Sequence, residues 1–247
     1  MAGAIAPEIV RGATPRPSFH LWMALLMCLF IFGGFGLTYL GPLAKGTFPP
    51  APPVVHLHGI VFFGWMVLLV TQSALVNARN VRLHRSLGTF GIAYAGVLVF
   101  LGLLITIISA ATTNWTDDSY GLMYLSVVAP VSFTAIFSLA ITNARTPAVH
   151  RNLILLATLS ILMPGINRLY MVGLELSHVP FYGTYATMDA MLAAILFQER
   201  KATATISRST WIAAAVIVVP QLLLPVVVPW QGFREFCNFM GSLVYYR

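Results

Sequence analysis

Residues 87–111 read LGTFGIAYAGVLVFLGLLITIISAA, a run of 25 positions without a charged side chain. A helix of about 20 apolar residues crosses the ~30 Å hydrocarbon core of a bilayer, so this run is long enough to span it. Lipid offers the backbone no hydrogen-bond partner, whereas a helix satisfies its own N–H and C=O groups. The run therefore predicts a transmembrane helix.

Six further apolar runs accompany this one, near 20–40, 54–76, 121–142, 152–174, 182–198 and 209–229. Together they predict an all-α, polytopic transmembrane bundle of about seven spans, which forms a single domain over 1–247. The run at 182–198 is short and contains Asp189, and the last run carries three prolines. Six spans therefore stay an open alternative.

The composition excludes a water-soluble domain. Of the 247 residues, 58% are apolar and 9% are charged, whereas soluble domains carry roughly 25% charged residues. A chain of this kind would expose a large contiguous apolar surface in water, so the lipid bilayer is its expected partner. The net charge of +7 comes from short clusters between the apolar runs. No folded basic face remains for nucleic acid, and no nucleic-acid partner is expected.

The basic residues predict the orientation, because Lys and Arg concentrate in cytoplasmic loops. Ten of them lie before the first run or in alternate loops after it, and the other set of segments holds only Lys45, Arg234 and Arg247. We therefore expect residues 1–19 to form a cytoplasmic N-terminal segment. Residues 230–247, which mix aromatic and charged side chains, are expected to form an outer interfacial tail.

A short motif occurs twice, which predicts a duplicated two-helix hairpin. Residues 77–87 and residues 143–153 both fit Asn-Ala-Arg-x4-His-Arg-x-Leu, and six of eleven positions are identical at a constant offset of 66. Both copies occupy the cytoplasmic turn between two apolar runs. Arg-rich loops also arise by convergence under the positive-inside rule. The shared Asn and His favour duplication, with repeats at 54–111 and 121–174.

The motif carries a resemblance that extends over residues 56–170. The chain resembles bacterial multi-span membrane-protein families of unknown function. More distantly, it is similar to membrane proteins that assist the maturation of haem-copper oxidases. The resemblance rests on His56, Gly59, Gln72, His84-Arg85-x-Leu87-Gly88, His150-Arg151-x-Leu153 and Asn167-Arg168. It implies a location in the bacterial inner membrane, haem b as a cofactor and a respiratory or other membrane complex as a partner.

Two histidines are candidate haem or metal ligands. His84 and His150 occupy equivalent positions of the two copies, so they lie at the same predicted depth. Haem iron commonly takes axial His ligands in helical bundles, and Arg85 and Arg151 would then reach the haem propionates or lipid headgroups. The alternative interpretation is that these His-Arg pairs only anchor helices in the headgroup layer.

A second candidate site is the outer polar cluster, which comprises His56, His58, Asn167, Arg168 and Asp189. Arg168 and Asp189 lie at similar predicted depths, and an unpaired charge there would cost several kcal/mol. The sequence therefore predicts that these two residues form an ion pair. The pair is either a structural tie or part of a functional pocket, because ionisable residues at membrane depth often mark ligand pathways.

These patterns give three hypotheses for function. The first is a haem-linked role, either b-type electron transfer or assistance to respiratory-oxidase assembly. The second is a transporter or lipophilic small-molecule binder that uses the outer polar cluster. The third is an accessory subunit of a larger membrane complex. No phosphate loop, haem-attachment motif or catalytic triad order is present, so a stand-alone enzyme is not favoured.

Overall fold

The computed structural model describes residues 17–176 and 180–244, so most of the predicted cytoplasmic segment and the end of the tail lie outside the described residues. Within these ranges the chain is helical and contains no β-strand, as predicted. The elements are α1 (Phe19–Phe35), the π-helical η1 (Gly36–Leu40), α2 (Gly41–Ala44), α3 (Pro53–Asn77), α4 (Val81–Thr112), α5 (Asp117–Thr142), α6 (Pro147–Ser160), α7 (Met163–Arg168), the π-helical η2 (Leu169–Gly173), α8 (Pro180–Thr203), α9 (Arg208–Val227) and α10 (Gln231–Ser242).

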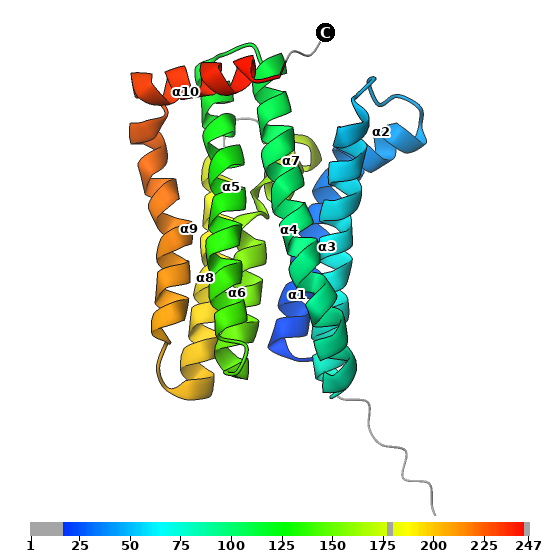
Figure 1. The fold of residues 1–247 in the computed structure, drawn as a ribbon, viewed down its shortest axis with the longest axis vertical. Coiled ribbons are helices and arrows are strands. Elements are labelled where there is room, and N and C mark those ends of the chain that lie inside the picture. Colours follow the sequence, from blue (N-terminus) through cyan, green and yellow to red (C-terminus); the bar gives the residue numbers. More distant parts are fainter. Residues whose placement is uncertain (1–16, 177–179, 245–247) are drawn as a thin grey trace, which may run out of the picture.

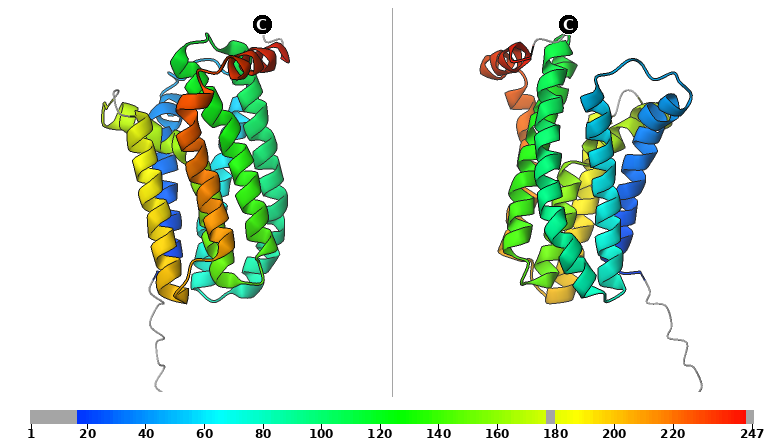
Figure 2. Two further views of the ribbon diagram at one scale, coloured as in Figure 1. Left: turned by 90° about the vertical axis from the view of Figure 1, so that its left-hand side faces the viewer. Right: turned by 45° about the vertical axis from the view of Figure 1, so that its right-hand side comes forward.

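The long helices lie side by side in one bundle, and α10 crosses one end of it (Figure 1). The first described helix, α1, begins at the opposite end, as the further views also show (Figure 2). Following the predicted orientation, we call the end that carries α10 the outer end and the opposite end the inner end. The helices α4, α6 and α9 begin at the inner end.

Five segments are long and apolar enough to cross a membrane, namely Phe19–Ala44, Pro53–Asn77, Val81–Thr112, Asp117–Thr142 and Arg208–Val227. A sixth results if α6 and the segment Met163–Gly173, which are bent by 48° against each other, count as one span. The helix α8 is long enough but is not among these segments, and it carries Asp189, Glu199, Arg200 and Lys201. Length and composition thus support five or six spans among the described residues, and the predicted count of seven is not confirmed.

Trp65 of α3 lies inside the bundle and contacts both α5 and α6. This side chain is only 4% exposed, and its ring lies edge-on to Phe133 of α5 at a centroid distance of 5.2 Å. Its Nε1–H donates to Thr158 Oγ1 of α6 over 3.2 Å, which satisfies the indole inside the apolar core. One side chain therefore fixes α3, α5 and α6 against one another.

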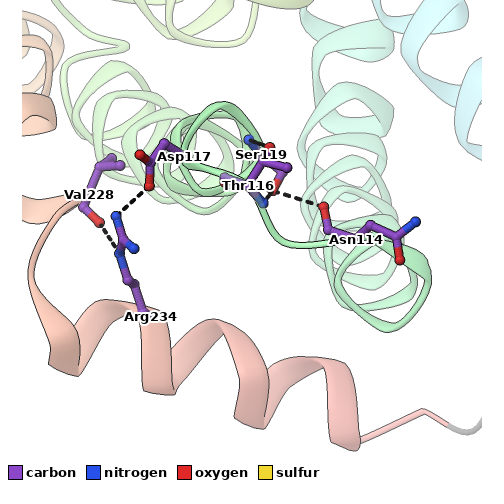
Figure 3. Close-up of polar contacts among 6 residues, drawn as sticks. All are labelled: Asn114, Thr116, Asp117, Ser119, Val228 and Arg234. Atoms are coloured by element: carbon purple, nitrogen blue, oxygen red, sulfur yellow. Dashed lines mark hydrogen bonds and ion pairs between the residues drawn. The ribbon is translucent and has the colours of Figure 1, made fainter.

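The outer end is closed by α10, which packs its apolar side on α4 and α5. Phe233, Cys237 and Met240 are buried in this contact. Arg234 donates to Val228 O over 3.3 Å and forms an ion pair of 2.6 Å with Asp117 at the start of α5 (Figure 3). An amphipathic helix across the end of a bundle is suited to a membrane interface, and the outer interfacial position of the tail stays a prediction.

The helix α5 has its own polar start next to this ion pair. Thr116 Oγ1 accepts from Ser119 N over 3.3 Å, and Ser119 Oγ accepts from Thr116 N over 2.6 Å, which forms a reciprocal capping box (Figure 3). Asp117 and Asp118 lie in the first turn, where a carboxylate interacts favourably with the helix dipole. Asp117 thus stabilises the start of α5 and also forms the ion pair with Arg234 of α10.

Candidate functional site

The path of the chain between residues 147 and 173 is broken inside the bundle. The helix α6 ends at Ser160, two residues intervene, and α7 starts at Met163 with Pro164 in its first turn. Proline has no backbone N–H to donate to the preceding turn, so a continuous helix through this point would lose a hydrogen bond. Ile161 and Leu162 at the break are buried. Irregular backbone at membrane depth occurs where protein or a cavity surrounds it, so the break is a natural place for a binding site.

Two glycines bring α7 into direct contact with α1. A Cβ atom on Gly34 would lie 2.1 Å from the carbonyl oxygen of Gly165, and a Cβ atom on Gly165 would lie 2.9 Å from Phe30 O. Only the absence of both side chains allows the two backbones to approach this closely. The π-helical turns η1 and η2 follow directly on these segments and contact each other. π-turns inside helices often accompany functional sites.

Arg168 lies at this junction. Its guanidinium carbon is 4.2 Å from the centre of the Phe35 ring on α1, and its Nη1 donates to Pro164 O over 3.0 Å. A guanidinium carries five N–H donors, and this is the one hydrogen bond that it makes to the described residues. No carboxylate of the described residues lies within 4.0 Å of it, since the one Arg–carboxylate ion pair there is Arg234–Asp117.

The predicted ion pair between Arg168 and Asp189 is therefore wrong. Asp189 faces α9, where its Oδ1 accepts from Gln221 Nε2 over 3.1 Å. Equal depth in two helices does not decide which way their side chains point, and the rotation of α8 directs Asp189 away from α7. Asp189 thus leaves the outer polar cluster.

The structure separates a second member from this cluster. His56 Nδ1 forms a hydrogen bond of 2.8 Å with Tyr39 OH, and its ring also lies beside Phe48. His58 packs its ring on Phe62 of the same helix at a centroid distance of 4.1 Å. Of the predicted outer polar cluster, Asn167 and Arg168 remain together as neighbours on α7, and we call these two residues the Arg168 site.

Several buried polar atoms near the same depth have no hydrogen-bond partner. They are His58 Nδ1, Asn167 Oδ1, Thr184 Oγ1 and Tyr185 OH. His58 is the sixth residue of α3, and Thr184 and Tyr185 are the fifth and sixth of α8. Asn167 precedes Arg168 on α7, and α7 packs against α8. A buried polar atom without a partner costs about 1–3 kcal/mol, so four of them in one half of the bundle call for an explanation.

The inner end holds the other pair of predicted ligands. His84 and His150 are each the fourth residue of their helix. His150 Nδ1 bonds to Ala140 O over 2.8 Å, whereas His84 Nδ1 is buried without a partner. Arg85 and Arg151 are exposed beside them. Both histidines thus stand in the first turn of helices that begin at the inner end, and their common depth and a ligand role stay predictions.

A buried polar chain at the inner end was not predicted. His20 Nε2 lies 2.7 Å from Asn152 Oδ1, and Asn152 Nδ2 donates to Glu199 Oε2 over 3.0 Å. Glu199 Oε1 accepts from Ser207 N over 2.9 Å. The side chains of His20, Asn152 and Glu199 are all at most 9% exposed. Each residue stands near the end of a different apolar run, so no spacing in the sequence connects them.

Comparison with protein-family models, with curated proteins and with solved structures found no match to this chain. The resemblance over residues 56–170 therefore stays a prediction.

Proposed function

We propose that this protein binds a lipophilic small molecule with an anionic head group, inside the membrane and near the outer end of the bundle. The observation that carries the proposal is Arg168, a guanidinium within the bundle that has one hydrogen bond and no carboxylate partner among the described residues. This is the second of the three roles that the sequence suggested.

Arg168 carries a charge that the described residues leave without a carboxylate partner. A charged side chain inside a membrane bundle costs several kcal/mol unless it is paired. The cation–π contact with the face of Phe35 stabilises the charged guanidinium by about 0.5–2 kcal/mol, and one hydrogen bond from a charged donor contributes about 1.5–3 kcal/mol. The remaining N–H groups of Arg168 still lack acceptors. A carboxylate or phosphate head would supply them in a bidentate arrangement.

The neighbouring side chains suit the rest of such a ligand. Thr184 and Tyr185 of α8, which packs against α7, provide hydroxyl groups without partners that are able to donate to an oxygen of the head group. Ile166 and the partly buried Phe181 belong to the adjacent apolar core. A charged head on Arg168 with an apolar tail between helices therefore satisfies the polar and the apolar parts of this region together.

Oleate is a suitable probe, and oleyl alcohol is its uncharged counterpart. We expect oleate to raise the unfolding temperature of the protein in non-ionic detergent, because a ligand that binds only the folded state stabilises it, by about 2.7 kcal/mol at a hundredfold excess over its Kd. Oleyl alcohol should have a much smaller effect. The Arg168→Leu variant should lose the response to oleate, whereas Arg82→Leu, which removes an exposed charge at the inner end, should keep it.

The variant without ligand gives a second measurement. Replacing an unpaired charge by an apolar side chain of similar size should leave the free energy of unfolding unchanged or raise it, whereas breaking an existing pair would lower it by about 3–5 kcal/mol. Equal stabilisation of Arg168→Leu and of the unmodified protein by oleate would contradict the proposal. A response to oleyl alcohol as large as that to oleate would contradict it as well.

A further inference from the structure

We propose that Arg151, Arg200 and Arg208 form a binding surface for the phosphate head group of an anionic phospholipid at the inner end of the bundle. Arg151 lies near the start of α6, Arg200 lies near the end of α8, and Arg208 is the first residue of α9. The Arg168 site lies on α7, beyond the break that follows α6. The two sites share no residue, so this proposal does not depend on the proposed function.

Buried hydrogen bonds hold the three backbone segments that carry these arginines together. Asn152 Nδ2 donates to Glu199 Oε2 over 3.0 Å, and Ser207 N donates to Glu199 Oε1 over 2.9 Å. Each of these three residues is the direct chain neighbour of one arginine, namely Asn152 of Arg151, Glu199 of Arg200 and Ser207 of Arg208. The helix α6 also packs against both α8 and α9, and α8 ends beside the start of α9 at the inner end (Figure 2). The fold thus gathers three arginines that are far apart in the sequence.

The hydrogen-bonded residues are buried, whereas the arginines are exposed. Asn152 and Glu199 are 2% and 3% exposed. Both carboxylate oxygens of Glu199 already accept hydrogen bonds. All three arginines are exposed, and no carboxylate of the described residues lies within 4.0 Å of them, since the one Arg–carboxylate ion pair there is Arg234–Asp117. Guanidinium groups without a carboxylate partner are suited to bidentate contacts with a phosphate.

The charges of the described residues are distributed unequally between the two ends of the bundle. The exposed basic side chains of the inner end are Arg79, Arg82, Arg85, Arg145, Arg151, Arg200, Lys201 and Arg208. The exposed carboxylates lie toward the outer end, and they are Asp117, Asp118, Glu175 and Glu235. The inner end therefore attracts an anionic layer, as basic segments beside a membrane do.

The apolar side chains beside the arginines favour a phospholipid over a soluble acidic protein. Arg208 opens α9, which is long and apolar enough to cross a membrane, so this arginine lies where the hydrocarbon meets the phosphate layer. Trp211 in the first turn of α9 is 54% exposed, and Phe197, three residues before Arg200, is 69% exposed. Trp side chains are enriched at this interface. A phospholipid offers a phosphate to the arginines and an acyl chain to the neighbouring aromatic rings.

The experiment uses the full chain in non-ionic detergent, with dioleoyl-phosphatidylglycerol as the anionic probe and dioleoyl-phosphatidylcholine as the zwitterionic one. We expect native mass spectrometry to show tighter binding of phosphatidylglycerol, weakened by high salt because the arginines are exposed. A basic residue at an anionic lipid surface contributes a factor of about five in affinity. The triple variant Arg151→Gln, Arg200→Gln and Arg208→Gln should therefore bind phosphatidylglycerol about a hundredfold more weakly.

The matched control removes the same charge from the same end of the bundle. Arg79→Gln, Arg82→Gln and Arg85→Gln lie between α3 and α4, a segment that contributes neither hydrogen bond to Glu199. This triple variant should lose about tenfold or less, through the long-range field alone. Arg168→Leu should bind phosphatidylglycerol as the unmodified protein does.

Three results would overturn the proposal. The first is equal binding of the two phospholipids by the unmodified protein, a measurement that does not depend on whether a variant folds. The second is an equal loss of phosphatidylglycerol binding in the two triple variants, which would reduce the effect to net charge. The third is an acidic protein, rather than phospholipid, that stays bound when the chain is extracted from its membrane and that the first triple variant releases.

Discussion

Replacing Asn152 by Leu tests how much the buried polar chain at the inner end contributes to stability. The amide of Asn152 joins His20 of α1 to Glu199 of α8 through bonds of 2.7 and 3.0 Å, and it is 2% exposed. Leucine has a similar size but neither donates nor accepts, so one nitrogen of His20 and one oxygen of Glu199 lose their partners. Each orphaned group costs about 1–3 kcal/mol, more when it is charged, which gives a loss of about 3–5 kcal/mol.

The control for this measurement is Asn77→Leu. Asn77 is half-buried and accepts one hydrogen bond from Ser18 N over 2.8 Å, so its removal should cost about 0.5–1.5 kcal/mol. Reversible unfolding in mixed detergent micelles yields both free energies of unfolding.

Glu199→Gln refines the same test. Both partners of the carboxylate donate, namely Asn152 Nδ2 and Ser207 N. A glutamine turns an NH₂ group toward one of these donors and should cost about 1–3 kcal/mol. If Asn152→Leu is no more destabilising than Asn77→Leu, the hydrogen bonds among His20, Asn152 and Glu199 do not stabilise the folded protein. That result would contradict the prediction.

Three further outcomes follow from the structure. Gly34→Ala should lower the free energy of unfolding by about 1–3 kcal/mol or more, because its Cβ would meet Gly165 O at 2.1 Å. The control is Gly96→Ala, whose Cβ would have no atom within 4 Å. This variant should be neutral or stabilising in the same unfolding assay. The pKa of the Cys237 thiol is raised from 9.0 to about 11 by burial, so in a Cys28→Ser background maleimide should label it slowly at pH 8 until the protein is unfolded. Since the folded-state pKa is the higher one, the stability that the neutral thiol contributes is complete below pH 9.0 and is lost as the pH rises through about 11; rapid labelling of the folded protein would contradict its burial. Reporter fusions should place the N-terminus in the cytoplasm and the C-terminus outside, and an N-terminal reporter found outside would contradict the predicted orientation.

The sequence predicted the helical class correctly. The apolar runs near 20–40, 54–76, 87–111, 121–142 and 209–229 all became helices long enough to cross a membrane. His84 and His150 each stand at the fourth position of a helix, and their equal depth stays a prediction. The run at 152–174 was expected as one span, but Pro164 breaks it into two helices bent by 48°. The run at 182–198 became a helix that is too polar to pass as a span by composition.

The prediction of an ion pair between Arg168 and Asp189 was wrong for a reason that applies to helical bundles in general. Sequence position gives the depth of a residue, because each residue adds 1.5 Å along the helix. It does not give the rotation of one helix against another, which depends on how all side chains pack. Arg168 thus meets Phe35, and Asp189 meets Gln221, although both were expected to meet each other.

By itself, the sequence determined that the chain forms apolar helices, because a backbone in lipid has no other way to satisfy its polar groups. It also determined where along each helix the polar side chains lie. Only the tertiary structure decided which of them meet. Arg168 reaches Phe35 of α1 beside the close contact of Gly34 with Gly165, and His20, Asn152 and Glu199 form one chain of hydrogen bonds. These contacts depend on the rotation and the spacing of helices that are far apart in the sequence, and close packing of the whole core fixes both.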